Sequence, residues 1–213
     1  STLAYKLGRA TGYFKKPVWT VKYPENHLLT SIVLAEARAN GGQMVQCYRM
    51  NEEHVDGYVW NAHRTHARFA SNNRVLFLDR DSKSDVALIY SIAGMVWRNF
   101  SSLTVPSSET WDIMKTCDHV KQFTLAARLL EDNHIPYDAL VFGHPDFYDD
   151  TPSFKRLSRY KTVILPMLDA ISDRQAEYLR VWVRNGGQLI LWGDTGTRDE
   201  ELRIRSHSVF KDL

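Results

Sequence analysis

Four short apolar runs recur in the second half of the chain, each bounded by polar or turn-forming residues. They are Val86 to Tyr90, Asp138 to Phe142, Tyr160 to Pro166 and Gln188 to Trp192. Continuous apolar runs of this length are typical of strands buried on both faces of a parallel sheet. The pattern therefore predicts four buried strands in this half of the chain.

Apolar residues at helical spacing lie between these strands and predict two helices. The first has an acidic cap, a wide apolar stripe that predicts burial of much of the helix surface, and an asparagine and a proline at its end, at Asp118, Phe123, Leu125, Ala126, Ala127, Leu129, Leu130, Asn133 and Pro136. The second has a capping box, an apolar stripe and a closing pair of glycines, at Ser172, Gln175, Ala176, Leu179, Val183 and Gly186-Gly187. Caps of both kinds satisfy backbone groups that a helix end leaves unpaired.

Strands that alternate with helices imply parallel pairing with right-handed crossovers, so residues 85–213 are expected to form a flavodoxin-like doubly wound α/β domain. Such sheets bind ligands beyond the carboxyl ends of their strands. Those ends carry residues 91–94, 143–146, 167–170 and 193–197. A long loop from Gly94 to Thr116 holds Trp97, Phe100 and Trp111, and a loop of this size is expected to be functional or to pack on a neighbour.

The first part of the chain has a different pattern. Lys16 to Tyr23 is expected to form a strand, Leu28 to Asn40 a helix closed by Gly41-Gly42, and Gln43 to Tyr48 a second strand. Two strands cannot close a sheet by themselves, so their partners must lie elsewhere. The polar run Asp79 to Asp85 is interpreted as a linker, which gives domains at residues 1–80 and 85–213.

Composition excludes several classes of protein. The 27 basic and 25 acidic residues give a net charge of only +2, without the excess that a nucleic-acid-binding protein uses to displace counterions. No apolar run reaches the roughly 18 residues needed to cross a bilayer. The two cysteines, Cys47 and Cys117, fit neither a disulfide framework nor a metal-binding spacing. We therefore expect a globular protein with no metal, no cofactor, no nucleic-acid partner and no membrane partner.

Candidate nucleophiles of the common hydrolase types are missing from the sequence. A class I glutamine amidotransferase needs a cysteine in a sharp turn between glycines, and neither Cys47 nor Cys117 has that setting. Asp194-Thr195-Gly196 superficially matches the catalytic loop of aspartic proteases. Those enzymes need two such aspartates on an all-β scaffold, so this copy is interpreted as a turn at a strand end.

Glu25 is the carboxylate whose position most suggests chemistry, because it follows an apolar strand, where barrel enzymes place catalytic groups. Glycoside hydrolysis needs a second carboxylate about 5 to 10 Å away, and the first part offers no clear partner. Glu52, Glu53 and Asp56 follow the second strand, but no pattern singles out one of them as that partner. The cluster of His54, His63 and His66 has no matching acidic ligand and is interpreted as a solvated surface and not as a metal site.

Several segments of the second half occur in the order found in one known domain. These are Ala126 to Asp138, Leu157 to Pro166, Ile171 to Gln175, Val183 to Gly187 and Gly193 to Glu200. Together they make the chain from Asp85 onward resemble the β-galactosidase trimerisation domain, the amidotransferase-like module that follows the barrel in family 42 glycoside hydrolases. The resemblance implies a non-catalytic domain for assembly or for capping the sugar site, a homo-oligomer that is a trimer, and a carbohydrate substrate for the complete protein.

The first part is similar to the last two β/α units of the barrel in the same family. Lys16 to Glu25 would be the seventh strand, and Ala35 to Gly42 the end of its helix. The resemblance implies a retaining mechanism in which Glu25 is the nucleophile, while the acid/base carboxylate lies outside these residues. An alternative function is a small stand-alone α/β hydrolase or amidotransferase-like enzyme that acts at the carboxyl edge of its own sheet.

Overall fold

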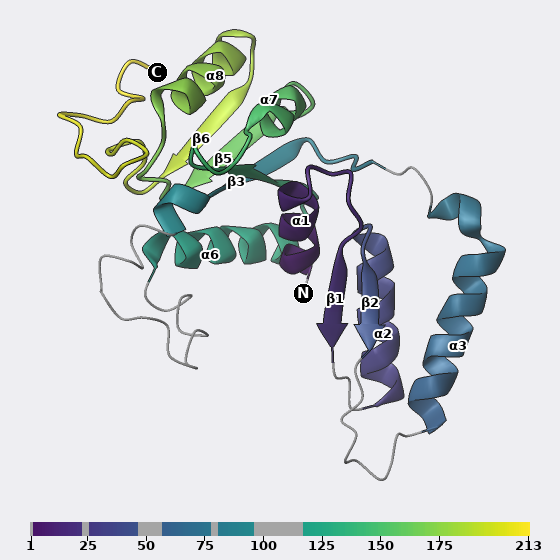
Figure 1. The fold of residues 1–213 in the computed structure, drawn as a ribbon. Helices are drawn as coiled ribbons and strands as arrows, with labels where there is room; N and C mark the ends of the chain where they lie inside the picture. The colour runs from purple at the N-terminus through teal and green to yellow at the C-terminus, as the bar shows by residue number, and fades with distance from the viewer. Residues whose placement is uncertain (1, 23–25, 47–56, 78–80, 96–116) are drawn as a thin grey trace. The chain divides into compact units, whose positions relative to one another are not determined.

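The computed structural model describes residues 2–22, 26–46, 57–77, 81–95 and 117–213. It divides into two compact units, Ser1–Ser82 and Lys83–Leu213. Both can be followed by residue number in Figure 1. The division falls within the polar run Asp79 to Asp85.

The first unit is a short α/β segment. Its elements are α1 (Thr2–Thr11), β1 (Trp19–Lys22), α2 (His27–Ala39), β2 (Gln43–Gln46), α3 (Gly57–Asn72) and the 3-10 helix η1 (Arg74–Leu76). β1 and β2 pair in parallel, with Trp19 opposite Gln43 and Lys22 opposite Gln46. The β-α-β order matches the sequence prediction, whereas α1 has no counterpart in it.

Local sequence explains where α2 begins and ends. Asn26 caps the helix, because its side-chain oxygen accepts a hydrogen bond from the N–H of Leu29 at 2.9 Å. Gly41, at φ 71°, ends it in the left-handed conformation that glycine tolerates. Gly42 lies against the buried ring of Tyr5 from α1, and a side chain there would collide with that ring. The glycine pair therefore ends α2 and leaves room for the Tyr5 ring of α1.

The second unit is a parallel α/β domain. Its elements are β3 (Val86–Ser91), α6 (Asp118–Asp132), β4 (Tyr137–Phe142), α7 (Thr151–Leu157), β5 (Thr162–Pro166), α8 (Asp173–Arg184) and β6 (Gln188–Trp192). The strand order is β4-β3-β5-β6, and every pairing is parallel. In chain order this is 2-1-3-4, the flavodoxin arrangement. The predicted fold class is thus confirmed.

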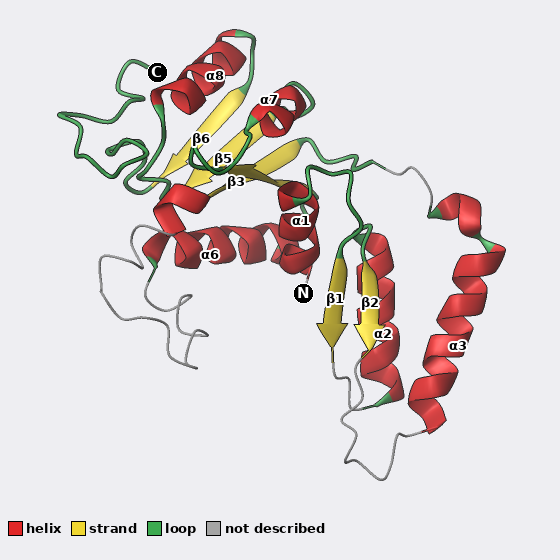
Figure 2. Cartoon of the chain, in the orientation of Figure 1, coloured by secondary structure: helices red, strands yellow, loops and turns green. Residues whose placement is uncertain are grey.

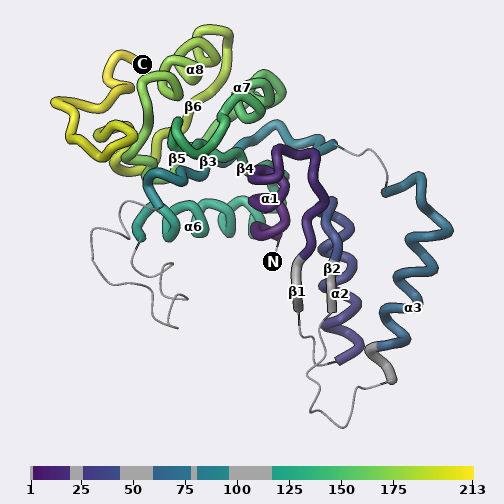
Figure 3. The backbone as a smooth tube through the Cα atoms, in the orientation of Figure 1, coloured from purple at the N-terminus to yellow at the C-terminus, as the bar shows by residue number. Residues whose placement is uncertain are grey.

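Helices cover both faces of this sheet, as Figures 2 and 3 show. α6 packs on β3 and β5 from one side, while α7 contacts β4 and α8 contacts β6 from the other. The strands β3, β4 and β5 are almost fully buried, with Leu88, Leu140 and Leu165 each inaccessible to solvent. Phe123 of α6 and Leu179 of α8 complete the core from the two faces.

Several boundaries differ from the sequence prediction. Asp118 is the first residue of α6 and not its cap, which is Cys117 without a side-chain bond. The apolar stripe of α6 is also narrower than predicted, because Leu125 and Leu129 are 45% and 46% exposed. On α8 the prediction placed Val183 on the buried face, but Val183 is only half-buried and Trp182 is buried instead. The helix α7 was not predicted, because its seven residues are too few to show a helical period.

The largest departure concerns β6, which the apolar run predicts to be buried on both faces. Among the described strands it pairs only with β5, so it forms one edge of the sheet. Ile190 is 47% exposed and Leu191 is 42% exposed. Because successive side chains of a strand point to opposite faces, both faces of β6 are partly exposed. The strand has the composition of an interior strand in an edge position.

No helix among the described residues has the length and apolar character needed to cross a membrane.

Candidate functional site

The carboxyl edge of the four-stranded sheet is the place where a flavodoxin-like domain would hold a ligand. Buried polar side chains do gather there. They are Ser91, His119, His144, Asp150, Asp169, Ser172, Gln175 and Thr195. Their hydrogen bonds show how this edge is used.

A buried network joins the end of β4 to the start of α8. Asp150 accepts one hydrogen bond from the N–H of Gly143 at 2.8 Å and another from the side-chain amide of Gln175 at 2.6 Å. The same amide nitrogen donates to the carbonyl of Gly143 at 2.8 Å. Gln175 also completes the predicted capping box, since Ser172 and Gln175 bond each other's backbone N–H. These polar groups satisfy one another and hold the end of β4 against the start of α8.

Asp150 gives this network a dependence on pH. Burial raises the pKa of its carboxyl group, while the hydrogen bonds from Gly143 and Gln175 and the charge of Arg174 oppose that rise. Since the pKa is higher in the folded protein, the resulting stabilisation is present below the usual aspartate value and is lost as pH rises through the folded pKa.

We therefore expect the free energy of unfolding of the wild type, minus that of Asp150→Asn, to be largest in acid and to decrease toward neutral pH. The isosteric asparagine keeps an acceptor for Gly143 but cannot titrate, so the difference isolates this carboxyl. Urea titrations of both proteins between about pH 4 and pH 7 would measure it. A difference that grows in favour of the wild type with rising pH would contradict this interpretation.

A second network ties the end of β3 to the end of β5. Nε2 of His119 accepts a hydrogen bond from the N–H of Ser91 at 2.8 Å, so Nδ1 carries the proton and donates to the carbonyl of Pro166 at 3.0 Å. The Ser91 hydroxyl accepts from the N–H of Gly94 at 2.9 Å and donates to the carbonyl of Ala170 at 3.3 Å. The histidine therefore binds the serine's backbone and not its hydroxyl, and this is no nucleophile–base pair.

The other potential reactive groups near this edge are also held in the interior. Cys117 is fully buried, and its Sγ lies 3.8 Å from the carbonyl oxygen of Gly94. Burial raises the pKa of Tyr90 to about 12, with a smaller contribution from Cys117, so its phenol stays neutral at physiological pH. Neither group is presented to a substrate at the carboxyl edge.

The segment that follows β6 folds back over the carboxyl end of β5. Backbone N–H groups of Gly196 and Arg198 donate to the carbonyls of Leu168 and Asp169, each at 2.9 Å. The carbonyl of Arg198 in turn accepts from the N–H of Ile171 at 3.2 Å. The strand end where a ligand would bind is thus occupied by the chain itself.

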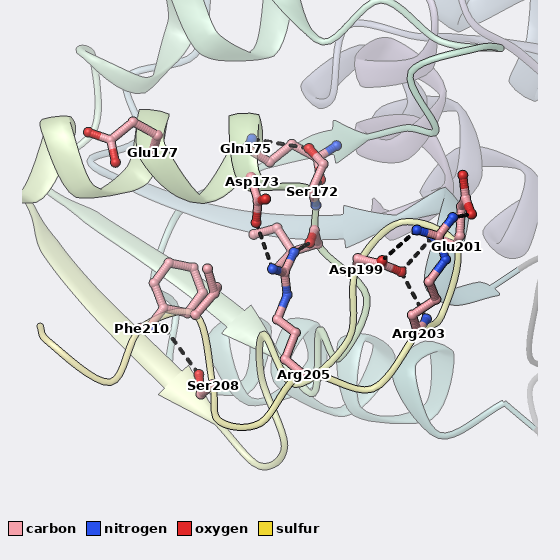
Figure 4. Close-up of polar contacts among 12 residues, drawn as sticks. Ser172, Asp173, Gln175, Glu177, Asp199, Glu201, Arg203, Arg205, Ser208 and Phe210 are labelled. Carbon is pink, nitrogen blue, oxygen red and sulfur yellow. Dashed lines mark hydrogen bonds and ion pairs between the residues drawn. The ribbon is translucent and has the colours of Figure 1, made fainter.

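Side chains hold this C-terminal segment in place, as Figure 4 shows. Arg205 donates to the carbonyl of Ile171 at 3.0 Å and pairs with Asp173 of α8 at 2.6 Å. Farther along, the hydroxyl of Ser208 donates to the carbonyl of Thr195 at 2.7 Å, and the ring of Phe210 is buried. The segment is an integral part of the domain.

The predicted turn at Asp194-Thr195-Gly196 lies within this segment. Gly193 and Gly196 both have positive φ, at 67° and 69°, and the hydroxyl of Thr195 donates to the carbonyl of Trp192 at 3.3 Å. Asp194 is exposed. The motif turns the chain at the end of β6, and the described residues place no second Asp-Thr-Gly beside it.

The candidates of the first unit fall largely outside the described residues. The residues outside the described ranges are Glu25, Cys47, Glu52, Glu53, His54 and Asp56. In the second unit, the aromatic residues Trp97, Phe100 and Trp111 of the long loop also lie outside these ranges. His63 and His66 belong to α3, and burial is the main cause that lowers the pKa of each. In the described parts of the chain, no group of three or more histidine, cysteine, aspartate or glutamate side chains is arranged to hold a metal ion.

Reasoning from sequence missed the residues that organise the carboxyl edge, namely His119, Asp150 and the amide of Gln175. The capping box did single out Gln175, but only for its bond to Ser172. His119 and Asp150 carry no local signal, because their partners lie 28 and 25 residues away in the sequence. The geometry defines a flavodoxin-like domain whose carboxyl edge is filled by its own polar groups.

Comparison with known proteins agrees with this class of domain. Residues 146–213 match the family model of the β-galactosidase trimerisation domain. No curated protein sequence matches the chain. The matched residues include α7, α8, β6 and the segment that closes the carboxyl edge. This part of the chain is therefore similar to the trimerisation domain of β-galactosidases, in agreement with the resemblance seen in the sequence.

Solved structures with a similar fold are also β-galactosidases. The one from Bacillus circulans sp. alkalophilus has 18% identity and a TM-score of 0.65, covering 95% of this chain and 31% of that protein. The one from the Antarctic haloarchaeon Halorubrum lacusprofundi has 16% identity and a TM-score of 0.62, covering 100% and 32%. At these identities the likeness shows the fold.

The chain spans roughly a third of the length of these β-galactosidases. It resembles part of a glycoside hydrolase, and the comparisons offer no support for the alternative of a small stand-alone hydrolase or amidotransferase-like enzyme.

Proposed function

We propose that this chain is the C-terminal portion of a glycoside-hydrolase-like protein, in which residues 83–213 assemble the protein and take no part in catalysis. The observation that carries the proposal is the match of residues 146–213 to a trimerisation domain. The closed carboxyl edge supports it, because the strand-end positions that would hold a substrate bond one another or the C-terminal segment. A surface specialised for assembly does not need an open pocket.

The first unit is the end of the catalytic barrel in this proposal. Its two strands pair in parallel and are connected by helix α2. A strand followed by a helix is the repeating unit of a β/α barrel. Glu25 follows the end of β1 at Lys22 by three positions. Barrel enzymes place catalytic groups at the carboxyl ends of their strands, so Glu25 is the proposed nucleophile of a retaining glycosidase.

The partners follow from these roles. The assembly partner is further copies of the same chain, in a trimer, and the substrate is a carbohydrate with a β-galactoside as the first candidate. A trimer needs a heterologous interface, in which two different patches of each subunit meet. The acid/base carboxylate comes from residues outside this sequence, so the two units alone would not hydrolyse a glycoside.

A direct test compares the 213-residue chain with the complete protein on a chromogenic β-galactoside. We expect turnover by the complete protein and none by the chain, because one carboxylate cannot complete the double displacement. The chain is also expected to leave a chromogenic ester and free glutamine unchanged. Hydrolysis of either by the isolated chain would overturn the proposal in favour of a stand-alone enzyme.

A further inference from the structure

Two histidines lie on the inner side of helix α3, which packs against α2 in the first unit (Figure 1). Ala62 of α3 is buried, and His63, His66 and Ala70 are half-buried. Spacings of three and four residues place these side chains on one side of the helix. Both histidines are therefore only partly solvated, whereas the sequence interpretation places them on a solvated surface.

The ring of His63 has a polar atom in the interior. Its Nε2 is buried and has no hydrogen-bond partner among the described residues, which is uncommon for a buried nitrogen. A neutral imidazole tolerates this position when Nε2 is the unprotonated acceptor. A protonated ring would place an N–H donor and part of a positive charge at the same buried atom, which costs considerably more free energy.

The charged groups that act on the two histidines are basic. The charges of Arg38 and His27, both on α2, act on His66, and the charge of His66 acts on His63. Arg38 lies over the ring of Phe77, with its Cζ atom 5.7 Å from the ring centroid. A positive charge from α2 is thus already present beside α3 before either histidine is protonated.

Acidic groups that would offset these charges are scarce on the elements around α3. The helix itself, Gly57–Asn72, contains no aspartate or glutamate, and its two arginines are exposed. The acidic residue of α2 is Glu36, whose carboxylate accepts a hydrogen bond from the hydroxyl of Thr2 in α1 at 2.7 Å. The short helix η1, which follows α3, contributes Arg74 and no acid. Within the described part of the first unit, the packing of α3 therefore favours neutral imidazoles.

Burial and charge act on both histidines in the same direction. Burial is the larger cause of the lowered pKa of His63, and the charge of His66 adds to it. For His66 burial again comes first, followed by Arg38 and His27, so its pKa is lowered too. Because both pKa values fall below 6.5 on folding, the stabilisation is present above pH 6.5. It is lost as the pH falls from that value toward the folded pKa.

We propose that α3 is an acid-sensitive element of the first unit and separates from α2 when His63 and His66 become protonated. The two charges would arise on one side of the helix, where they repel each other and Arg38 of α2. Separation relieves this repulsion and lets water solvate each imidazolium. The proposal concerns the first unit alone and holds whether or not the second unit assembles the protein.

Hydrogen exchange followed by mass spectrometry of the 213-residue chain would test it. Peptides from residues 60–72 are compared at pH 7.5 and pH 5.5, after correction for the intrinsic pH dependence of exchange. At pH 5.5, one unit below the ordinary histidine value of 6.5, each histidine can favour the open helix by at most about tenfold. We expect the protection of α3 to fall by about tenfold, while that of α8 does not fall. Unchanged or higher protection of α3 at pH 5.5 would overturn the proposal.

The double variant His63→Leu, His66→Gln separates the two histidines from other effects of acid. Neither replacement titrates, and leucine suits a buried position that lacks a polar partner, so α3 should keep its protection at pH 5.5. The matched control His207→Gln removes an exposed histidine of the second unit and should respond like the wild type. A fall in the folded double variant as large as that in the wild type would contradict the role of His63 and His66.

Circular dichroism at neutral pH would verify that the double variant folds. If it has lost helix, His66→Gln alone carries the comparison, because His66 is half-buried and glutamine is polar. Its loss of protection between pH 7.5 and pH 5.5 should then be smaller than that of the wild type. An equal loss would overturn the proposal.

Discussion

In the complete protein, Glu25→Gln is expected to lower glycoside turnover by about 10⁴-fold or more and to leave folding unchanged. The neutral amide cannot attack the anomeric carbon, so no covalent glycosyl-enzyme intermediate would form. Steady-state kinetics on a chromogenic β-galactoside would measure the loss, and thermal melting would show that the fold persists. Chemistry and stability would then be separated at one residue.

A matched control is available on the helix that follows. Glu36 of α2 accepts a hydrogen bond from the hydroxyl of Thr2 at 2.7 Å, and an amide oxygen can accept the same bond. Glu36→Gln should therefore keep turnover near normal and change stability by less than about 1 kcal/mol. If Glu25→Gln behaved in the same way, the assignment of Glu25 as nucleophile would be withdrawn.

His119→Ala is expected to destabilise the second unit by about 4 kcal/mol. The substitution would leave a cavity beside the rings of Tyr90 and Phe123, whose centroids lie 5.2 and 6.2 Å from the imidazole. It would also remove the buried partners of the Ser91 N–H and the Pro166 carbonyl. Urea unfolding followed by tryptophan fluorescence would give the change in free energy.

His119→Phe separates the two contributions. A phenyl ring fills most of the same volume but makes neither hydrogen bond, so we expect a loss of about 2 kcal/mol, clearly less than for alanine. A loss below about 0.5 kcal/mol would mean that the two buried backbone groups gain little from His119. Equal losses for the two variants would instead assign the whole effect to the bonds.

Sequence patterns predicted the second unit well where its structure depends on local periodicity. The apolar runs located β3, β4, β5 and β6, and the Ser172–Gln175 capping box located the start of α8. Periodicity carries this information because each strand or helix must place its own apolar face against the core. The absence of a nucleophile elbow could likewise be read directly from the neighbours of the two cysteines.

Features that depend on distant partners could not be predicted in this way. The C-terminal segment reaches the end of β5 through backbone groups such as those of Gly196 and Leu168, which any sequence would possess. Asp150 lies in a stretch of polar residues that reads as a solvated loop, yet its carboxyl is buried by pairing with Gln175. The exposure of β6 was also hidden, because an apolar run indicates a strand that can be buried but not whether it has a neighbour.

The mass of the wild-type 213-residue chain in solution decides whether the second unit is built for assembly. Sedimentation velocity over a range of protein concentrations would measure that mass, with the same samples assayed for ester and glutamine hydrolysis. A domain built for assembly predicts a complex of three chains of 24.6 kDa that has neither activity. A chain that stays monomeric at every concentration and hydrolyses either substrate would contradict the assembly role.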